Sequence, residues 1–213
     1  MKKPSPSSRK SLADLVADLG GVPLKRIRAF PPPGTATEAD VVRERRPCEL
    51  IDGTLVERAL WLKASILICE LQRLLGDHVW GNHLGVLLGA GGTLRLSPRL
   101  VRSADVAFVS WDDVPGAEWP DGPIPKIRPT LAVEVFKPDN TPGEIRLKIR
   151  EYFQAGTRLV WVIDPKKQNA RAYTAPDSSR LVAKSGSLDG GEVLPGFRLP
   201  LPELFGSLKK APA

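Results

Sequence analysis

The sequence contains only two cysteines and two histidines among 213 residues, and no long apolar run. The spacing of Cys48 and Cys69 matches no metal-binding motif. No stretch reaches the ~20 apolar residues of a membrane-spanning helix, and no apolar signal-peptide core follows the basic N-terminus. A disulfide framework, a thiolate metal site and a membrane span are therefore not expected, and two free thiols in a reducing cytoplasm are the simplest interpretation.

Acidic residues are outnumbered by basic ones, which gives a formal net charge of +7 and a pI of about 9.6. This balance favours polyanionic partners such as nucleic acid. Several of the extra lysines and arginines lie near the two ends of the chain, and no lysine and arginine stripe in the sequence is interleaved with aromatic residues. Composition alone fits a generically basic protein equally well.

Chain length and hydrophobic content predict one domain with one sizeable core. The chain has 42% hydrophobic residues and no composition shift or linker that would divide it. We expect a single domain over residues 11–206, with disordered tails at 1–10 and 207–213.

Hydrophobic spacing and turn residues predict a mixed α/β fold. Asp52 and Gly53 separate two β-prone runs, which is the pattern of a tight hairpin. Thr141, Pro142 and Glu144 have the residue types that begin a helix. The expected helices cover 11–19, 37–45, 60–78 and 141–156, and the expected strands flank Asp52-Gly53 and cover 85–88, 93–96, 104–109, 130–136 and 158–164, followed by a β-rich remainder.

Two acidic residues interrupt runs that are otherwise apolar. Glu134 stands in the middle of "LAVEVF", and Asp105 directly precedes "VAFV". Burying a carboxylate costs several kcal/mol unless a cation, a hydrogen-bond donor or water compensates it. If the two strands are neighbours, a hard divalent cation such as Mg²⁺ would relieve the repulsion. The alternative is that each acid is solvated at a strand end or is paired with an arginine such as Arg102.

Lys148 borders the apolar stripe of the helix that follows the Glu134 strand. Ile145, Ile149 and Tyr152 form this stripe at 100° per residue. Because the helix must pack back against the sheet, we expect Lys148 to approach the acids, although a lysine at such a border often only extends along apolar surface. Two carboxylates and an ammonium are the minimum set for metal-assisted phosphodiester cleavage, since the metal lowers the pKa of bound water and the ammonium stabilises charge on the phosphate.

Three segments, "CELIDGTLVE", "VRSADVAFVS" and "LAVEVFKPDNTPGEIRLKIREYFQAGTRLVWVIDP", together resemble the putative restriction endonuclease family of the PD-(D/E)XK nuclease superfamily. That family was long catalogued as a bacterial domain of unknown function. The resemblance covers residues 37–206, and the last segment is the most specific. It implies a restriction-endonuclease-like fold with a central mixed β-sheet flanked by α-helices, and Mg²⁺-dependent hydrolysis of DNA, with Mn²⁺ as an alternative ion.

The resemblance also implies roles for individual residues. Asp105 falls on the acid of the "PD" half of the motif, and Glu134 falls on the acid of the (D/E)XK half. These two carboxylates and the carbonyl of Val135 would hold the metal. Lys148 matches the place of a lysine that has moved to the following helix, and Glu49 matches a further acid that assists the metal site.

The chain departs from the family pattern in several places. Ala104 replaces the proline of the motif, and Phe136 stands where the lysine of the superfamily commonly stands. Lys137 comes next and is the alternative to Lys148 as the lysine of the site. Residues 61–63 replace the histidine that often opens the long helix. The departures at Lys137 and at 61–63 leave a second hypothesis open, a non-catalytic nucleic-acid-binding or regulatory module that retains the nuclease fold.

The expected partner is DNA, although no segment of the sequence separates DNA from RNA or predicts a recognition sequence. Cleavage of both strands would suggest a homodimer, but no segment predicts a dimer interface. We expect a cytoplasmic protein without membrane association.

Overall fold

The structure is a computed structural model that describes residues 11–114, 116 and 118–208. The segments 1–10 and 209–213, which contain most of the two predicted tails, lie outside the described residues. Ser207 and Leu208 of the predicted C-terminal tail follow the last helix, and Leu208 packs against the main core.

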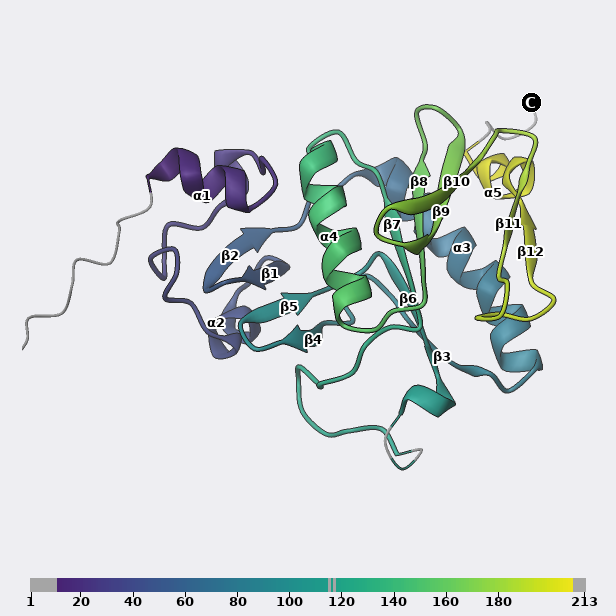
Figure 1. Ribbon diagram of the computed structural model, residues 1–213, viewed down its shortest axis with the longest axis horizontal. Helices are drawn as coiled ribbons and strands as arrows, with labels where there is room; N and C mark the ends of the chain where they lie inside the picture. Colours follow the sequence, from purple (N-terminus) through teal and green to yellow (C-terminus); the bar gives the residue numbers. More distant parts are fainter. Residues whose placement is uncertain (1–10, 115, 117, 209–213) are drawn as a thin grey trace, which may run out of the picture.

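Most strands belong to two sheets (Figure 1). The larger sheet has the order β10 (Ser178–Val182), β9 (Asn169–Ala175), β8 (Leu159–Asp164), β7 (Leu131–Val135), β6 (Val106–Ser110) and β3 (Gly85–Leu88). The smaller sheet has the order β2 (Thr54–Glu57), β1 (Cys48–Ile51), β5 (Leu100–Arg102) and β4 (Leu94–Ser97). A further pair consists of β11 (Ser187–Asp189) and β12 (Arg198–Pro200).

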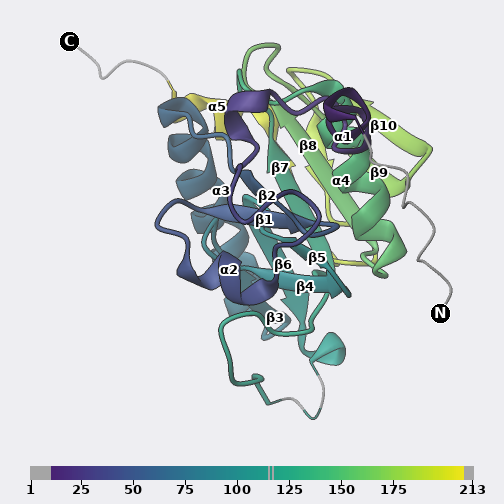
Figure 2. The ribbon, with the colours of Figure 1, turned by 90° about the vertical axis from the view of Figure 1, so that its left-hand side faces the viewer.

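Helices cover both faces of the larger sheet (Figure 2). The helices are α1 (Leu12–Asp18), α2 (Glu38–Arg43), α3 (Leu62–Gly81), α4 (Pro142–Gln154) and α5 (Leu201–Gly206). On one face, α3 and α5 pack on β7 and β8 and form the main core; α4 lies on the opposite face. Within the described residues, no helix has both the length and the apolar character needed to cross a membrane.

The larger sheet is mixed, as predicted. β7 and β8 run parallel, because α4 connects them as a crossover. β6 pairs antiparallel with β7, and β9 pairs antiparallel with β8. The element that supplies Glu134 and the element that supplies Lys148 are therefore consecutive in the chain and stacked in space.

Local signals in the sequence account for the element boundaries. Asp52 and Gly53 both adopt positive φ, +45° and +74°, which is the geometry of a two-residue hairpin turn. The Thr141 hydroxyl accepts a hydrogen bond from the backbone N–H of Glu144 at 3.0 Å, which caps α4 as predicted. The turn and the cap thus fix where β1 ends and where α4 begins.

Two elements differ from the sequence prediction. Residues 100–102 form β5, a strand that the prediction did not separate, and the predicted strand at 104–109 begins only at Val106, so that Asp105 precedes it. Residues 201–206 form α5 rather than a β-rich end. Pro202 lies in the first turn of α5, where a missing N–H is tolerated, and Leu201 and Leu204 are buried in the main core.

Arg26 fixes the beginning of α4 against the N-terminal half of the chain. Its guanidinium donates to both carboxylate oxygens of Glu144 at 2.9 and 2.7 Å and to the backbone carbonyls of Glu57 and Asp139. Burial alone would raise the pKa of Glu144, but the hydrogen bonds from Arg26 and the attraction of Lys148 outweigh it and lower that pKa. Arg26 and Glu144 are 5% and 1% exposed, so the pair is a buried tether.

We expect Arg26→Met to destabilise the fold by about 3 kcal/mol at neutral pH, because it leaves the Glu144 carboxylate buried without its partner. The pKa of Glu144 is lower in the folded state than in the unfolded state, where it is about 4.3. The ionised Glu144 carboxylate therefore stabilises the fold fully above this unfolded-state pKa, and the stabilisation is lost as the pH falls through the folded-state pKa. The difference in unfolding free energy between the wild type and Arg26→Met, measured by urea unfolding, should therefore become smaller at acidic pH.

Lys25→Met is the matched control, because Lys25 pairs with Asp139 at the surface, where both side chains are largely exposed. Its cost should stay below about 1 kcal/mol. Equal losses in the two variants would contradict the assignment of Arg26 as the tether.

Candidate active site

Glu134 lies on the face of β7 that α4 covers. Ala132, two residues earlier, packs with Ile145 and Ile149 of α4, whereas Val133 and Val135 belong to the core on the α3 side. This is the alternation that the sequence predicts. Glu134 is only 2% exposed, so its carboxylate depends on partners within the protein.

Lys148 extends from α4 to two of the predicted acids. Its Nζ lies 3.0 and 3.1 Å from the two carboxylate oxygens of Glu134 and 3.0 Å from Oε1 of Glu49 on β1. The hydroxyl of Tyr152, one helical turn further along α4, donates to Oε1 of Glu134 at 2.8 Å. Lys148 therefore approaches the acids, as the spacing of the helix face predicts, and its ammonium joins the two sheets through one carboxylate on each side.

Glu49 has further partners next to this contact. It accepts hydrogen bonds from Nη1 of Arg102 at 2.8 Å and from the backbone N–H of Ser103 at 3.1 Å. The Nε of Arg102 also donates to Glu151 of α4 at 2.8 Å. Arg102 is thus paired with Glu49 and Glu151, and not with Glu134 or Asp105, for which the sequence suggests it as an alternative partner.

Asp105 reaches the same region from the chain between β5 and β6. Its Oδ2 accepts from the backbone N–H of Val135 at 2.8 Å, which places the carboxylate beside the residue that follows Glu134. The ammonium of Lys137 lies 2.6 Å from Oδ2 and donates to the carbonyl of Val135 at 3.2 Å. Arg58, which directly follows β2, donates to Oδ1 at 2.8 Å. Asp105 is thus paired with an arginine, as the alternative interpretation proposed, although with Arg58 rather than Arg102.

The three predicted acids have different electrostatic surroundings. Burial raises the pKa of Glu134, and the negative charges of Asp105 and Glu49 raise it further. The attraction of Lys148 lowers this pKa, but not enough to cancel the increase. For Glu49, burial also acts to raise the pKa, but Lys148, Arg102 and Arg58 outweigh it, so that the pKa is well below its ordinary value. Glu134 contacts one side-chain cation, Lys148, whereas Glu49 and Asp105 each contact two.

Lys148 remains protonated between these acids. Burial would lower its pKa, yet the carboxylates of Glu134 and Glu49 outweigh burial and raise it. Burial and the charge of Glu134 also raise the pKa of Tyr152, which keeps its hydroxyl a hydrogen-bond donor. The site therefore holds a fixed ammonium and a neutral phenol next to the Glu134 carboxylate.

Four carboxylates and four cations make up the buried cluster. The carboxylates belong to Glu49, Asp105, Glu134 and Glu151, and the cations to Arg58, Arg102, Lys137 and Lys148. Because the charges balance, the protein can bury the cluster without an added ion. A divalent cation would have to take the place of one of these side-chain cations.

The oxygen atoms nearest Lys137 fit the ligand preferences of Mg²⁺. Oδ2 of Asp105 and the carbonyl of Val135 converge on one ammonium, and the adjacent Glu134 carboxylate favours additional positive charge. Mg²⁺ prefers oxygen ligands and is often bound by one or two carboxylates together with water and substrate phosphate. Among the described residues, no three acidic, histidine or cysteine side chains are grouped as a ready metal site. The residues fit an ion only if Lys137 moves away.

Arg58 and Glu151 are not predicted from the sequence as residues of this cluster, and Lys137 is predicted only as an alternative catalytic lysine. Arg58 contacts Asp105 across 47 positions of the chain and also donates to the carbonyl of Ala90, contacts that no local pattern predicts. Lys137 was visible as a basic residue three positions after Glu134. Its direction was not, because it lies beyond the end of β7, where strand alternation no longer applies.

Comparison with known proteins shows which family and which fold the chain resembles. Residues 38–202, well over half of the chain, match the family model described as Uma2, putative restriction endonuclease. The fold is similar to the crystal structure of a putative nuclease belonging to DUF820 from Anabaena variabilis ATCC 29413, with a TM-score of 0.70 and 18% sequence identity over 78% of this chain and 93% of that one. No curated protein matches the chain.

Proposed function

The chain belongs to the putative restriction endonuclease family Uma2, and from this premise we propose that it is a Mg²⁺-dependent endonuclease that hydrolyses phosphodiester bonds in DNA. Family membership supports a nuclease, and the fold that the chain shares with a putative nuclease agrees with it. The metal, the DNA substrate and the residues of the site are the finer parts of the proposal.

One observation supports the proposal most strongly: the carboxylates of Glu134 and Glu49, which belong to different sheets, meet at the single ammonium of Lys148. Asp105 joins them through the backbone of Val135. A purely structural role does not require three buried acids from three segments, since well-packed apolar residues would stabilise the same core at least as well. Such a concentration of buried ionisable groups is typical of functional sites.

In the proposed site, Asp105, Glu134 and the carbonyl of Val135 would hold the ion. A bound Mg²⁺ would supply an activated water and would neutralise phosphate charge. Lys148 would stabilise the negative charge that develops on the phosphate, and Tyr152 and Glu49 would hold Glu134 and Lys148 in position. Hydrolysis forms a bond from phosphorus to the water oxygen and breaks one bond from phosphorus to an ester oxygen, which leaves with a proton.

A second candidate function is a non-catalytic nucleic-acid-binding module. The pairing of Asp105 with both Arg58 and Lys137 favours it, because the two oxygens of that carboxylate are already engaged by cations. In this case the cluster is a neutral, buried ion network and binds no divalent ion.

Cleavage of supercoiled plasmid by the purified chain tests the proposal. We expect nicked product with Mg²⁺ or Mn²⁺ and none with excess EDTA. If neither ion produces cleavage and calorimetry detects no binding of either ion, the endonuclease proposal fails and the second candidate remains.

A further inference from the structure

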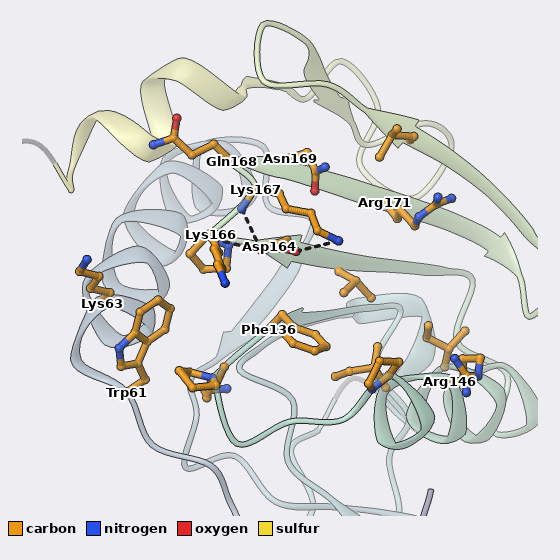
Figure 3. Close-up of a pocket in the computed structure, with 18 of the residues that line it drawn as sticks. Trp61, Lys63, Phe136, Arg146, Asp164, Lys166, Lys167, Gln168, Asn169 and Arg171 are labelled. Atoms are coloured by element: carbon orange, nitrogen blue, oxygen red, sulfur yellow. Dashed lines mark hydrogen bonds and ion pairs between the residues drawn. The ribbon is translucent and has the colours of Figure 1, made fainter. Parts of the chain in front are cut away.

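A groove of about 1260 Å³ lies next to the buried cluster, on the side of the larger sheet that carries α4. Figure 3 shows the groove and its lining residues. Its walls are formed by α4, the beginning of α3, the turn between β8 and β9, and β9 itself. Lys137 lines the groove, while its ammonium contacts Asp105 in the cluster. Lys137 therefore connects the groove to the candidate active site.

Basic side chains surround this groove. Lys63 comes from α3, Arg146 from α4, Arg171 from β9, and Lys166 and Lys167 from the β8–β9 turn, and all five are exposed. Figure 3 shows them on different sides of the groove, around Phe136. Among the residues that the structure describes, no carboxylate lies within ion-pair distance of any of these side chains except for Asp164, 3.7 Å from Lys167. The rim is thus strongly positive.

Asp164 does not neutralise this rim. Its Oδ1 accepts hydrogen bonds from the backbone N–H groups of Lys166 and Lys167, both at 3.0 Å, so the carboxylate holds the turn that presents the two lysines. One acid against five exposed cations leaves a clear excess of positive charge for a polyanion.

Aromatic and aliphatic side chains form the floor. Phe136 and Tyr173 are half-buried and pack with Val162 and Ile149. Trp61, also half-buried, adds an aromatic ring at the wall formed by the beginning of α3, where the Lys63 ammonium lies 5.9 Å from the ring centroid. Such a floor has no partner in a double helix, whose bases are stacked inside and whose surface presents phosphates. Unstacked bases, in contrast, stack on aromatic rings while their phosphates contact surrounding lysines and arginines.

We propose that this groove binds a single-stranded segment of nucleic acid, with bases on Phe136, Trp61 and Tyr173 and phosphates on the basic rim. The volume exceeds the ~300–1,000 Å³ of pockets for drug-sized ligands, which agrees with an occupant longer than one small molecule. Binding of a single strand in the groove does not depend on catalysis. Guidance of that strand to Asp105 and Glu134 for cleavage is a further step, and it rests on the proposed function.

Fluorescence anisotropy in EDTA tests binding without cleavage. The probes are oligo(dT) and oligo(rU) of about 15 nucleotides and a DNA duplex of the same length. We expect both oligonucleotides to bind more tightly than the duplex, and the tighter of the two identifies the preferred sugar. A duplex that binds as tightly as either single strand, or more tightly, would overturn the proposal.

Variants locate the binding to the groove. The double variant K166Q/K167Q should weaken oligonucleotide binding about tenfold and lower the slope of log K against log salt by about 0.7 for each lost phosphate contact. Lys126 and Lys184 are exposed and lie outside the groove, so K126Q/K184Q is the charge-matched control, with an expected change of less than about twofold. Equal losses in both double variants would contradict a specific groove.

Phe136→Ala tests the aromatic floor separately from the rim. It should weaken binding about tenfold without changing the salt slope, since stacking releases no counterions. Unchanged affinity in this variant would remove the argument for unpaired bases. Because none of these measurements uses cleavage, a chain that binds the oligonucleotides but never cuts would retain the groove and refute only the endonuclease.

Discussion

Glu134→Gln is expected to abolish Mg²⁺-dependent cleavage, with a loss of about 10³-fold or more, while leaving the protein folded. The amide keeps the shape of the side chain and still accepts the hydrogen bond from Tyr152, but it removes the negative charge that a metal would need. Because burial raises the pKa of Glu134, the charged form is costly in the folded protein. The variant removes this cost but leaves the buried Lys148 ammonium with Glu49 as its remaining carboxylate partner, so we expect it to stay folded with a loss of about 1–3 kcal/mol in unfolding free energy, even though it is inactive.

Glu203→Gln makes the same chemical change at an exposed position of α5 and serves as the control. It should leave cleavage unchanged and change stability by less than about 1 kcal/mol, because Glu203 is an exposed acid in the first turn of α5. If Glu134→Gln cut DNA as well as the control did, Glu134 would have no role in the reaction and the site would have to be placed elsewhere.

Lys137→Met is expected to increase the affinity for Mn²⁺ or Mg²⁺ about tenfold or more in calorimetric titration. In the wild type, the Lys137 ammonium lies 2.6 Å from Oδ2 of Asp105 and also donates to the carbonyl of Val135, so a metal must displace it. Removal of the ammonium leaves these oxygens available. It also leaves Asp105 with Arg58 as its remaining side-chain cation, so the metal-free variant should lose about 1–3 kcal/mol of stability, and added metal should restore it.

The same variant separates the two roles that Lys137 can have. If Lys137 is instead the lysine of the reaction, its substitution removes cleavage without any gain in metal affinity. If the cluster is a neutral structural network, the variant is destabilised and no metal rescues it. Melting temperatures with and without Mn²⁺, measured beside the titration, distinguish these outcomes from the expected one.

The sequence predicts those parts of the site that depend on local periodicity. Glu134 and Lys148 lie on facing surfaces, as strand alternation and the 100° spacing of the following helix predict. The Nζ of Lys148 is 3.0 Å from Oε1 of Glu134. The mixed sheet follows in the same way, because strand, crossover helix and strand are consecutive and demand a parallel pair.

The pairing of the remaining charges could not be predicted, because it depends on packing between distant segments. Arg58 meets Asp105 only when the hairpin folds over the larger sheet, and Arg102 is committed to Glu49 and Glu151 by the orientation of β5. The groove has the same origin. Its basic residues come from four separate elements, and the sequence shows them only as part of an overall net charge of +7.

Anomalous scattering from a crystal soaked in Mn²⁺ is the most direct test of whether this cluster is a metal site. We expect a peak between the carboxylates of Asp105 and Glu134 and the carbonyl of Val135, with the Lys137 ammonium withdrawn from Asp105. A crystal in which that ammonium still contacts Asp105 and no peak lies beside these oxygens would contradict this expectation.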